Sequence, residues 1–313
     1  MEHYPQLNLP LQGLTVAITS SRRASELGHV VEALGARPYF SPTVGIEAAE
    51  KTSVADCLNL LLSIEDGSVY IAIFITGVGT ESVFLAAEEL GLKDKLIERL
   101  RSVPLIIARS TKPSSTLAKY GIKENVKVAP EANFQGIIQV LDGYDLGGRK
   151  VVIFWHGGRS NYLVDSIKNL GANVFEFSTY FYSTGLNTQG RILLKSAGFG
   201  KSMSPERERI SELIRDLLAD KIDAIMFTSP PAVENLFNVA QTESKQDQLR
   251  LKLTHDVVTV SIGPSTSETL DSCGVKADVV PDVYKMGKMV ESLVSYLKNC
   301  ENAKRKKLLS SLL

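Results

Sequence analysis

The amino-acid sequence predicts an α/β protein with two similar lobes, each containing a parallel sheet flanked by helices. Two observations carry this prediction: short apolar strands alternate with amphipathic helices, and the pattern occurs twice. In the first cycle, residues 14–19 predict a buried strand, and apolar residues from Leu27 to Leu34 then recur at i, i+3, i+4 and i+7. Gly35 predicts the end of that helix. This alternation favours a parallel sheet with helices on both faces.

An internal repeat supports two lobes. The block that begins at Gly13 resembles the block that begins at Gly148, an offset of 135 residues. Residues 74–84 resemble residues 227–237, an offset of 153. The chain therefore holds two copies of one unit and an insertion of about 18 residues between the repeated blocks.

The insertion lies around residues 186–204. Its stretch from Gly190 to Met203 contains glycine and serine, so we expect a mobile loop there. Ser204 and Pro205 have the residue types of an N-cap followed by a first helical position, which predicts a helix running to Ala219.

Composition excludes several classes of function. The chain has 313 residues, with 35 basic and 35 acidic side chains, so bulk attraction to nucleic acid or an anionic membrane is not expected. Cys57, Cys273 and Cys300 form no C-x-x-C motif, and the four histidines have no metal-ligand spacing. Sparse cysteine, no apolar leader and apolar runs too short for a bilayer predict a cytoplasmic protein without a metal site.

Two glycine-containing motifs do not predict nucleotide binding. Gly200 and Lys201 resemble the end of a P-loop, but Lys195 occupies the place of its first glycine. Gly77 and Gly79 lack the third glycine of a dinucleotide site, and a tight strand-to-helix turn explains them. No Ser/His/Asp or Cys/His arrangement is evident.

Hydroxyl and glycine residues gather where six predicted strands end. The turns are 19–21, 76–79, 108–112, 156–158, 228–229 and 263–266, and the cations Arg22, Arg109, Lys112 and Arg159 lie in or beside them. Ligands of open parallel sheets bind outside the carboxyl ends of the strands, where helix N–H groups favour anions. Any single serine or threonine is better explained as an N-cap, and His156 as readily by a polar loop end. Together, the turns predict an anionic ligand in a cleft between the lobes.

Six short motifs extend in order over residues 12–297. They are Val16–Thr19, Phe74–Gly79, Ala108–Pro113, Leu163–Tyr180, Asp223–Ser229 and Ile262–Thr266. In order, spacing and duplication they resemble the uroporphyrinogen-III synthase family. The resemblance implies two α/β lobes joined by a two-strand hinge at residues 38–44 and 176–182.

The resemblance also implies the extent of each lobe. One lobe would comprise residues 1–40 and 183–300, and the other residues 45–178. Two thin linkers imply rigid-body opening. We expect residues 301–313 to form a frayed surface tail, with a basic docking segment as the alternative.

By the same resemblance, the chain would close hydroxymethylbilane, a linear tetrapyrrole with eight carboxylates, to uroporphyrinogen III. Water is lost and ring D is inverted, and no metal or organic cofactor is implied. The enzyme would act as a cytoplasmic monomer, with transient hand-over of substrate from hydroxymethylbilane synthase and no nucleic-acid or membrane partner. Two alternatives remain open: a non-catalytic tetrapyrrole-binding or sensor paralogue, and an unrelated isomerase of small phosphorylated substrates.

The resemblance implies a catalytic role for Tyr180 as a hydrogen-bond or proton donor to the leaving hydroxyl. Tyr182 is a competitor on the same face of the strand, and aromatic packing at the hinge is the structural alternative. Where the family more commonly has Gly-x-x-Thr, this chain has Ser110-x-x-Pro113, so Arg109 or Lys112 would supply a charged contact instead. The expected substrate-binding residues are Thr19, Ser20, Arg22, Thr76, Gly77, Val78, Arg109, Lys112, His156, Gly157, Thr228, Ser229, Pro264, Ser265 and Thr266.

Overall fold

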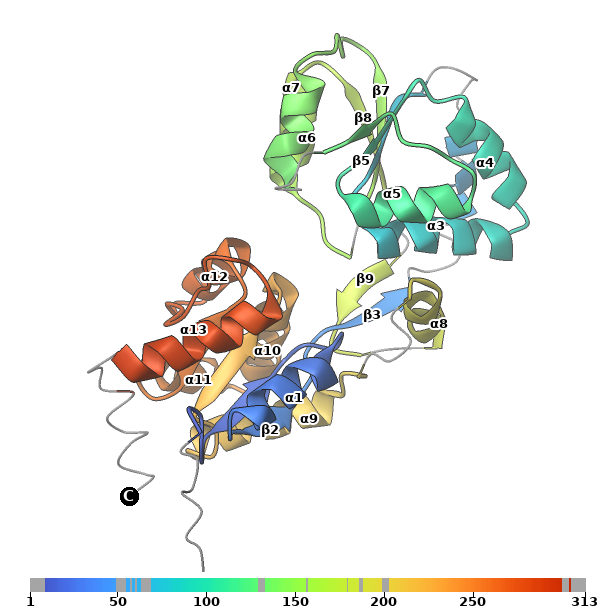
Figure 1. Ribbon diagram of the computed structural model, residues 1–313. Coiled ribbons are helices and arrows are strands. Elements are labelled where there is room, and N and C mark those ends of the chain that lie inside the picture. The colour runs from blue at the N-terminus through green and yellow to red at the C-terminus, as the bar shows by residue number, and fades with distance from the viewer. Residues whose placement is uncertain are drawn as a thin grey trace, which may run out of the picture. The chain divides into compact units, whose positions relative to one another are not determined.

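The chain forms two compact units in a computed structural model (Figure 1). The structure describes residues 9–48, 55–56, 58–59, 61–62, 69–128, 133–155, 157–178, 180–185, 188–198, 203–299 and 304. Unit 1 comprises Met1–Gly45, Ser183–Leu186 and Lys201–Leu313, and unit 2 comprises Ile46–Tyr182 and Asn187–Gly200. The segment 187–200 lies inside the range expected for the first lobe, but it groups with unit 2.

Unit 1 is built on a four-stranded parallel sheet in the order β11-β10-β1-β2. Its strands are β1 (Thr15–Ile18), β2 (Arg37–Phe40), β10 (Ala224–Phe227) and β11 (Val258–Ser261). Every residue of β1, β10 and β11 is buried, as continuous apolar runs in a parallel sheet predict.

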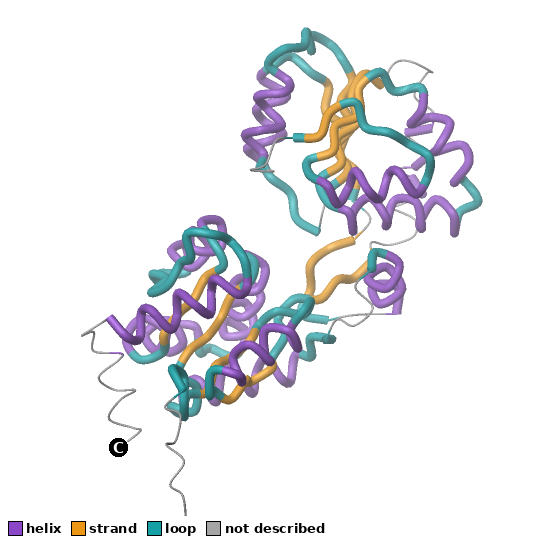
Figure 2. The backbone as a smooth tube through the Cα atoms, in the orientation of Figure 1, coloured by secondary structure: helices purple, strands orange, loops and turns teal. Residues whose placement is uncertain are grey.

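Helices cover both faces of this sheet (Figure 2). One face packs against α1 (Ala24–Ala33) and α13 (Met286–Asn299). The opposite face packs against α9 (Arg207–Leu218), α10 (Pro230–Thr242), α11 (Gln246–His255) and α12 (Pro264–Ser272). The predicted end of α1 is confirmed, because Gly35 follows its C-cap with a φ of 96° that favours glycine.

Unit 2 has a five-stranded parallel sheet in the order β6-β5-β4-β7-β8. Its strands are β4 (Val69–Phe74), β5 (Leu105–Ala108), β6 (Val126–Lys127), β7 (Lys150–Phe154) and β8 (Asn173–Phe177). One face packs against α3 (Gly77–Glu89), α4 (Lys93–Arg101) and α5 (Thr111–Lys119), and the other against α6 (Phe134–Leu141) and α7 (Asn161–Asn169). The predicted fold class is therefore confirmed.

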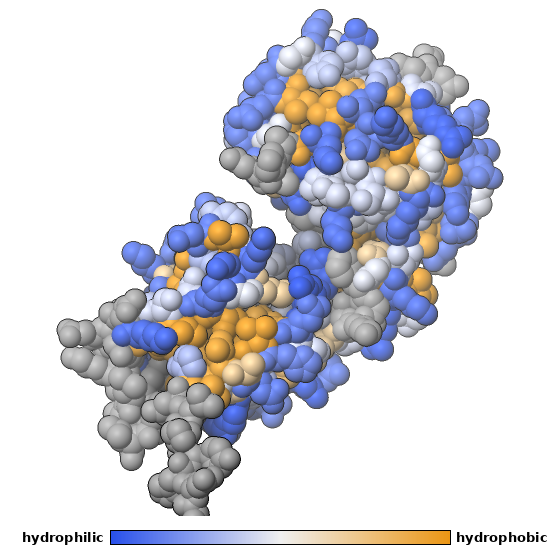
Figure 3. Space-filling view, in the orientation of Figure 1, coloured by the Kyte–Doolittle hydropathy of each residue, from blue (hydrophilic) through white to orange (hydrophobic). Residues whose placement is uncertain are grey.

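Two further strands, β3 (Gly45–Ala48) and β9 (Tyr180–Ser183), pair with each other in a separate sheet. In the space-filling view, hydrophilic residues cover much of the visible surface of each unit, with apolar residues between them (Figure 3). No helix in the described part of the chain is long and apolar enough to cross a membrane.

Three local predictions need correction. The insertion is not simply a loop, because residues Thr188–Ser196 form helix α8. Helix α9 begins at Arg207 with Glu206 as its N-cap, so Ser204 does not cap it. In the tail, Lys304 is 4% exposed and forms an ion pair with Asp278, so this residue is not frayed. The other tail residues lie outside the described part of the chain.

Candidate functional site

The Thr76–Gly79 motif caps helix α3 and allows its first turn to pack against the end of β7. The Thr76 hydroxyl caps the helix by accepting a hydrogen bond from the Gly79 backbone N–H at 3.0 Å. A Cβ atom at Gly79 would lie 2.5 Å from the Trp155 carbonyl oxygen, so only glycine fits where α3 meets the end of β7. Gly77 lies in the same turn, and Val78 is buried. The N-cap interpretation is correct for Thr76, which still leaves backbone N–H groups at the start of α3.

Arg109 places a cation at the carboxyl end of β5. Its backbone N–H donates to the Phe74 carbonyl at 3.0 Å, and its guanidinium carbon lies 5.5 Å from the centre of the Phe134 ring. The Nε atom is buried and has no hydrogen-bond partner among the described residues. Burial lowers the pKa of Arg109, whereas Tyr182 and Tyr180 raise it, and the group stays charged at neutral pH. A buried donor without a partner can receive an anionic ligand.

Tyr180 and Tyr182 lie on the same face of β9, with ring centres 6.0 Å apart in an edge-to-face arrangement. Tyr180 is only 2% exposed, whereas Tyr182 is partly exposed. The Tyr182 backbone N–H donates to the Gly157 carbonyl at 3.2 Å. A Cβ atom at Gly157, whose φ is 28°, would lie 2.7 Å from the Tyr182 ring. The absence of a side chain at Gly157 therefore leaves room for the Tyr182 ring. His156, the residue before it, lies outside the described residues.

Arg159 is paired within unit 2. Its Nε donates to Glu176 at 2.6 Å, and the Trp155 indole N–H donates to the same carboxylate at 2.9 Å. Burial would raise the pKa of Glu176, but the bonds from Arg159 and Trp155 outweigh it and hold that pKa below its usual value. Lys112 is exposed in the first turn of α5, and its Cβ lies close to Gly77. Arg109 follows β5 and Lys112 lies in the first turn of α5, so both cations belong to the β5–α5 turn.

The corresponding edge of unit 1 carries mostly hydroxyl groups. Thr19 is buried and donates to the Met226 carbonyl at 2.8 Å, whereas Arg22 is exposed. Ser20 is 4% exposed, and its hydroxyl has no hydrogen-bond partner among the described residues. Ser20 is the better candidate of the two hydroxyls for contact with a ligand.

Helices α10 and α12 begin with proline at the same edge. Ser229 is the N-cap of α10, but its side chain makes no capping hydrogen bond. Pro264 opens α12, and Ser265 after it is exposed. Thr266 is buried. The first turn of α10 offers no unbonded N–H group, because residues 230 and 231 are prolines and the Ala232 N–H donates to the Ser229 carbonyl at 3.1 Å. In α12, position 264 is a proline and the Thr266 N–H donates to the Gly263 carbonyl at 3.1 Å.

A pocket of about 680 Å³ opens beside these turns. It is lined by Arg23, Thr228, Ile262, Tyr284, Lys285, Met286, Gly287, Lys288 and Glu291. Arg23 and Lys288 are paired with Glu26 and Glu291, and Lys285 adds a third cation. Of these residues, only Thr228 was expected from the sequence. Arg23 lies in the turn before α1, Ile262 follows β11, and the others lie in α13 or just before it, so these residues come together only in the folded unit.

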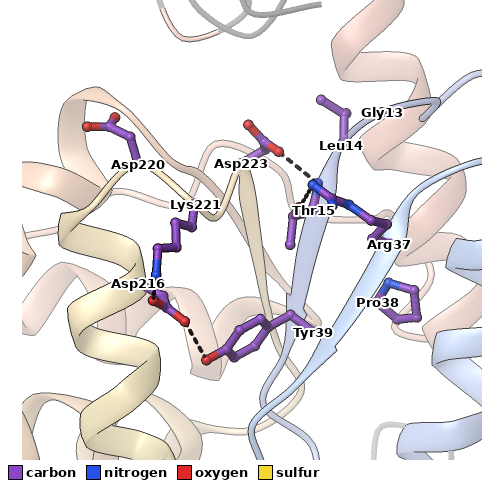
Figure 4. A pocket seen from close by; sticks show the side chains of 10 residues that line it. All are labelled: Gly13, Leu14, Thr15, Arg37, Pro38, Tyr39, Asp216, Asp220, Lys221 and Asp223. Atoms are coloured by element: carbon purple, nitrogen blue, oxygen red, sulfur yellow. Dashed lines mark hydrogen bonds and ion pairs between the residues drawn. The ribbon is translucent and has the colours of Figure 1, made fainter.

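A second pocket, of about 540 Å³, lies at the opposite, amino-terminal edge of the unit 1 sheet (Figure 4). Its polar groups satisfy one another. The Tyr39 hydroxyl and Lys221 both donate to Asp216, at 2.9 and 2.8 Å, and the Thr15 N–H donates to Asp223 at 2.7 Å. Burial raises the pKa of Tyr39, and Asp216 adds to the effect. These contacts close the sheet edge and leave no unpaired group that points to a ligand.

Comparisons with known proteins agree on one family. A family model described as uroporphyrinogen-III synthase HemD matches residues 25–291. An uncharacterized protein, YjjA from Bacillus subtilis, is 27% identical over 93% of this chain and 98% of its own length. A putative uroporphyrinogen-III synthase from Methanothermobacter thermautotrophicus is 24% identical over 87% of this chain and 93% of its own.

A solved structure has the same fold. The crystal structure of a mutant uroporphyrinogen III synthase from Thermus thermophilus superposes with a TM-score of 0.66 at 22% identity. The superposition covers 92% of this chain and all of that one.

Proposed function

This chain belongs to the uroporphyrinogen-III synthase family, and on that basis we propose that it closes hydroxymethylbilane to uroporphyrinogen III. The reaction removes the terminal hydroxyl as water. The azafulvene that results is attacked by the substituted carbon of ring D, and the spiro intermediate fragments and recloses with ring D inverted. The product enters tetrapyrrole biosynthesis, and the cytoplasm is the proposed compartment.

The observation that carries the proposal is the buried guanidinium of Arg109 at the carboxyl edge of unit 2. It has an unpaired Nε and lies within the electrostatic reach of Tyr180 and Tyr182. Arginine binds carboxylates through paired N–H donors, and such charge-assisted bonds are about twice as strong as neutral ones. Within unit 1, a pocket lined by Arg23, Lys285 and Lys288 likewise presents cations that suit carboxylate groups.

The protein has to favour attack by the more hindered carbon of ring D, because hydroxymethylbilane that closes without an enzyme gives the uninverted isomer. Holding the flexible substrate in one geometry is the main requirement, and acid assistance to the departing hydroxyl is the smaller one. We propose Tyr180 as the donor to that hydroxyl, with Tyr182 as the more accessible phenol of the pair. A tyrosine with an ordinary pKa of about 10 is a weak acid, so a hydrogen bond is its larger contribution.

A coupled assay tests the proposal. Hydroxymethylbilane is generated in situ, purified protein is added, and the oxidised products are separated by isomer. Predominantly type III product is expected. Type I product alone, at the spontaneous rate, would refute the activity and leave a tetrapyrrole-binding protein as the second candidate.

A further inference from the structure

The segment 187–200 makes the chain cross between the two units twice more than a two-strand hinge requires. Residues up to 182 belong to unit 2 and residues 183–186 to unit 1. The chain then returns to unit 2 for residues 187–200 and goes back to unit 1 at 201. This segment falls in the insertion that separates the two repeated blocks, so nothing corresponds to it in the other repeat.

An apolar stripe attaches the segment to unit 2. Helix α8 contacts α3, and its positions 190, 193, 194 and 197 follow the i, i+3, i+4, i+7 spacing of one face. Gly190, Leu193 and Leu194 are buried, whereas Ile192 on the other side of the helix is 53% exposed. Helix α3 is buried around most of its circumference because the sheet covers one side and α5 and α8 cover others.

A buried carboxylate adds a specific anchor. Glu81 of α3 is 3% exposed and accepts a hydrogen bond from the Ser196 hydroxyl at the end of α8. Lys119 of α5 pairs with Glu81 at 3.3 Å and also donates to the Ser196 carbonyl at 3.4 Å. A carboxylate inside a helix packing interface is unfavourable unless its oxygens have partners. Glu81 has partners on two helices: Ser196 of α8, and Lys119 and Tyr120 at the end of α5.

We propose that residues 187–200 act as a strap that restricts the rotation of one unit against the other. Two paired linker strands leave rotation about their own direction free. Two extra chain crossings, fixed by a docked helix, oppose that rotation. Release of α8 would turn the 14 residues into a flexible linker with a root-mean-square span of about 20 Å, and the restraint would disappear.

Distances between spin labels test the strap without any assay of activity. Labels are placed at exposed positions in each unit, with Leu251→Cys in unit 1 and Tyr144→Cys in unit 2, in a chain carrying Cys57→Ser, Cys273→Ser and Cys300→Ser. Leu193→Ala combined with Leu194→Ala removes the apolar stripe. The control is Ile192→Ala, on the exposed side of the same helix. We expect the double variant to broaden the distance distribution about twofold and the control to match the parent chain.

Hydrogen exchange of residues 188–196 shows whether α8 has been released. If α8 stays protected in the double variant, the distances are measured instead on a second variant, in which a glycine–serine linker of equal length replaces residues 187–200. Released or replaced α8 with an unchanged distance distribution would overturn the proposal. Because the readout is geometric, this outcome is independent of the isomer assay.

Discussion

The turns that follow β5 in unit 2 and β11 in unit 1 make the same backbone hydrogen bond, but one carries an arginine and the other an isoleucine. The N–H of Arg109 donates to the Phe74 carbonyl, and the N–H of Ile262 donates to the Phe227 carbonyl, each at 3.0 Å. Both residues follow the second strand of a repeated strand pair, β4–β5 and β10–β11. Arginine and isoleucine make this backbone hydrogen bond equally well, so the fold does not require the arginine side chain of unit 2.

A second repeated position points the same way. Asn125 and Ile106 exchange two hydrogen bonds, at 2.7 and 2.9 Å, and Asp278 and Thr259 make the equivalent pair at 2.8 and 2.9 Å. The neutral amide needs nothing more, but the carboxylate of Asp278 also takes an ion pair from Lys304 at 2.6 Å. The two repeats therefore have the same backbone hydrogen bonds here, and the charge of Asp278 serves a contact with the tail residue Lys304, which lies outside the repeat.

The largest effect is expected from Lys304→Ala. It would leave the Asp278 carboxylate, with a side chain only 13% exposed, without its cation, and removal of one partner of a buried pair costs about 3–5 kcal/mol. Urea unfolding should show the loss in unit 1. Lys304→Met with Asp278→Asn copies the neutral arrangement of unit 2 and should recover most of the stability. An unchanged unfolding midpoint for Lys304→Ala would show that the ion pair contributes nothing.

Arg109→Ile places in unit 2 the residue type that Ile262 provides at the equivalent position of unit 1, and so tests whether the arginine has a role beyond the fold. Loss of a charge-assisted contact worth about 1.5–3 kcal/mol corresponds to a roughly 10- to 150-fold weaker affinity for uroporphyrinogen III. The free energy of unfolding should not fall, because the variant removes a buried donor without a partner. The control is Lys221→Ala, a cation at the opposite edge of unit 1. Equal affinity for the parent and Arg109→Ile would remove Arg109 from the site.

The tyrosine pair should show a smaller effect. Tyr180→Phe and Tyr182→Phe each remove one hydroxyl, and the loss of one neutral hydrogen bond of about 1.4 kcal/mol would lower turnover about tenfold. The proposed donor is the tyrosine whose variant lowers kcat with an unchanged thermal midpoint. Equal losses of turnover and stability would make that tyrosine structural.

Much of the fold and part of the site could be predicted from the sequence. Apolar runs located the strands β1, β5, β10 and β11 because every residue in them is buried, whereas the edge strands β2, β6 and β8 are only partly buried. The repeat located the duplicated turns. Helix α8 was missed because Gly190 and Gly198 indicate a loop, and because the two buried leucines of its short apolar face are explained only by the contact with α3. The pairing of Arg159 was missed because Glu176, on the neighbouring strand, reaches it only in the folded sheet.

The smallest effect concerns pH at the amino-terminal edge of unit 1. Burial raises the pKa of Asp223, and the Thr15 N–H and Arg37 oppose this without cancelling it. The folded unit therefore binds this proton more tightly than the unfolded chain. The corresponding stabilisation is present below the ordinary carboxyl pKa of about 4 and is lost as the pH rises through the folded value. Asp223→Asn should flatten this part of the pH–stability curve, and an unaltered curve would contradict the assignment.

The strand order of unit 1 has a consequence for synthesis. Strand β1 lies between β2 and β10, and the hydrogen bond from Thr15 to Asp223 joins residues 208 positions apart. At about 5–20 residues per second, a ribosome needs about 10–40 s to add β10 after β1 has been made. Throughout that interval the backbone edge of β1 that pairs with β10 has no hydrogen-bonding strand beside it, while residues 46–182 can already fold. During synthesis, the amino-terminal part of unit 1 therefore stays without its complete sheet for longer than the residues of unit 2.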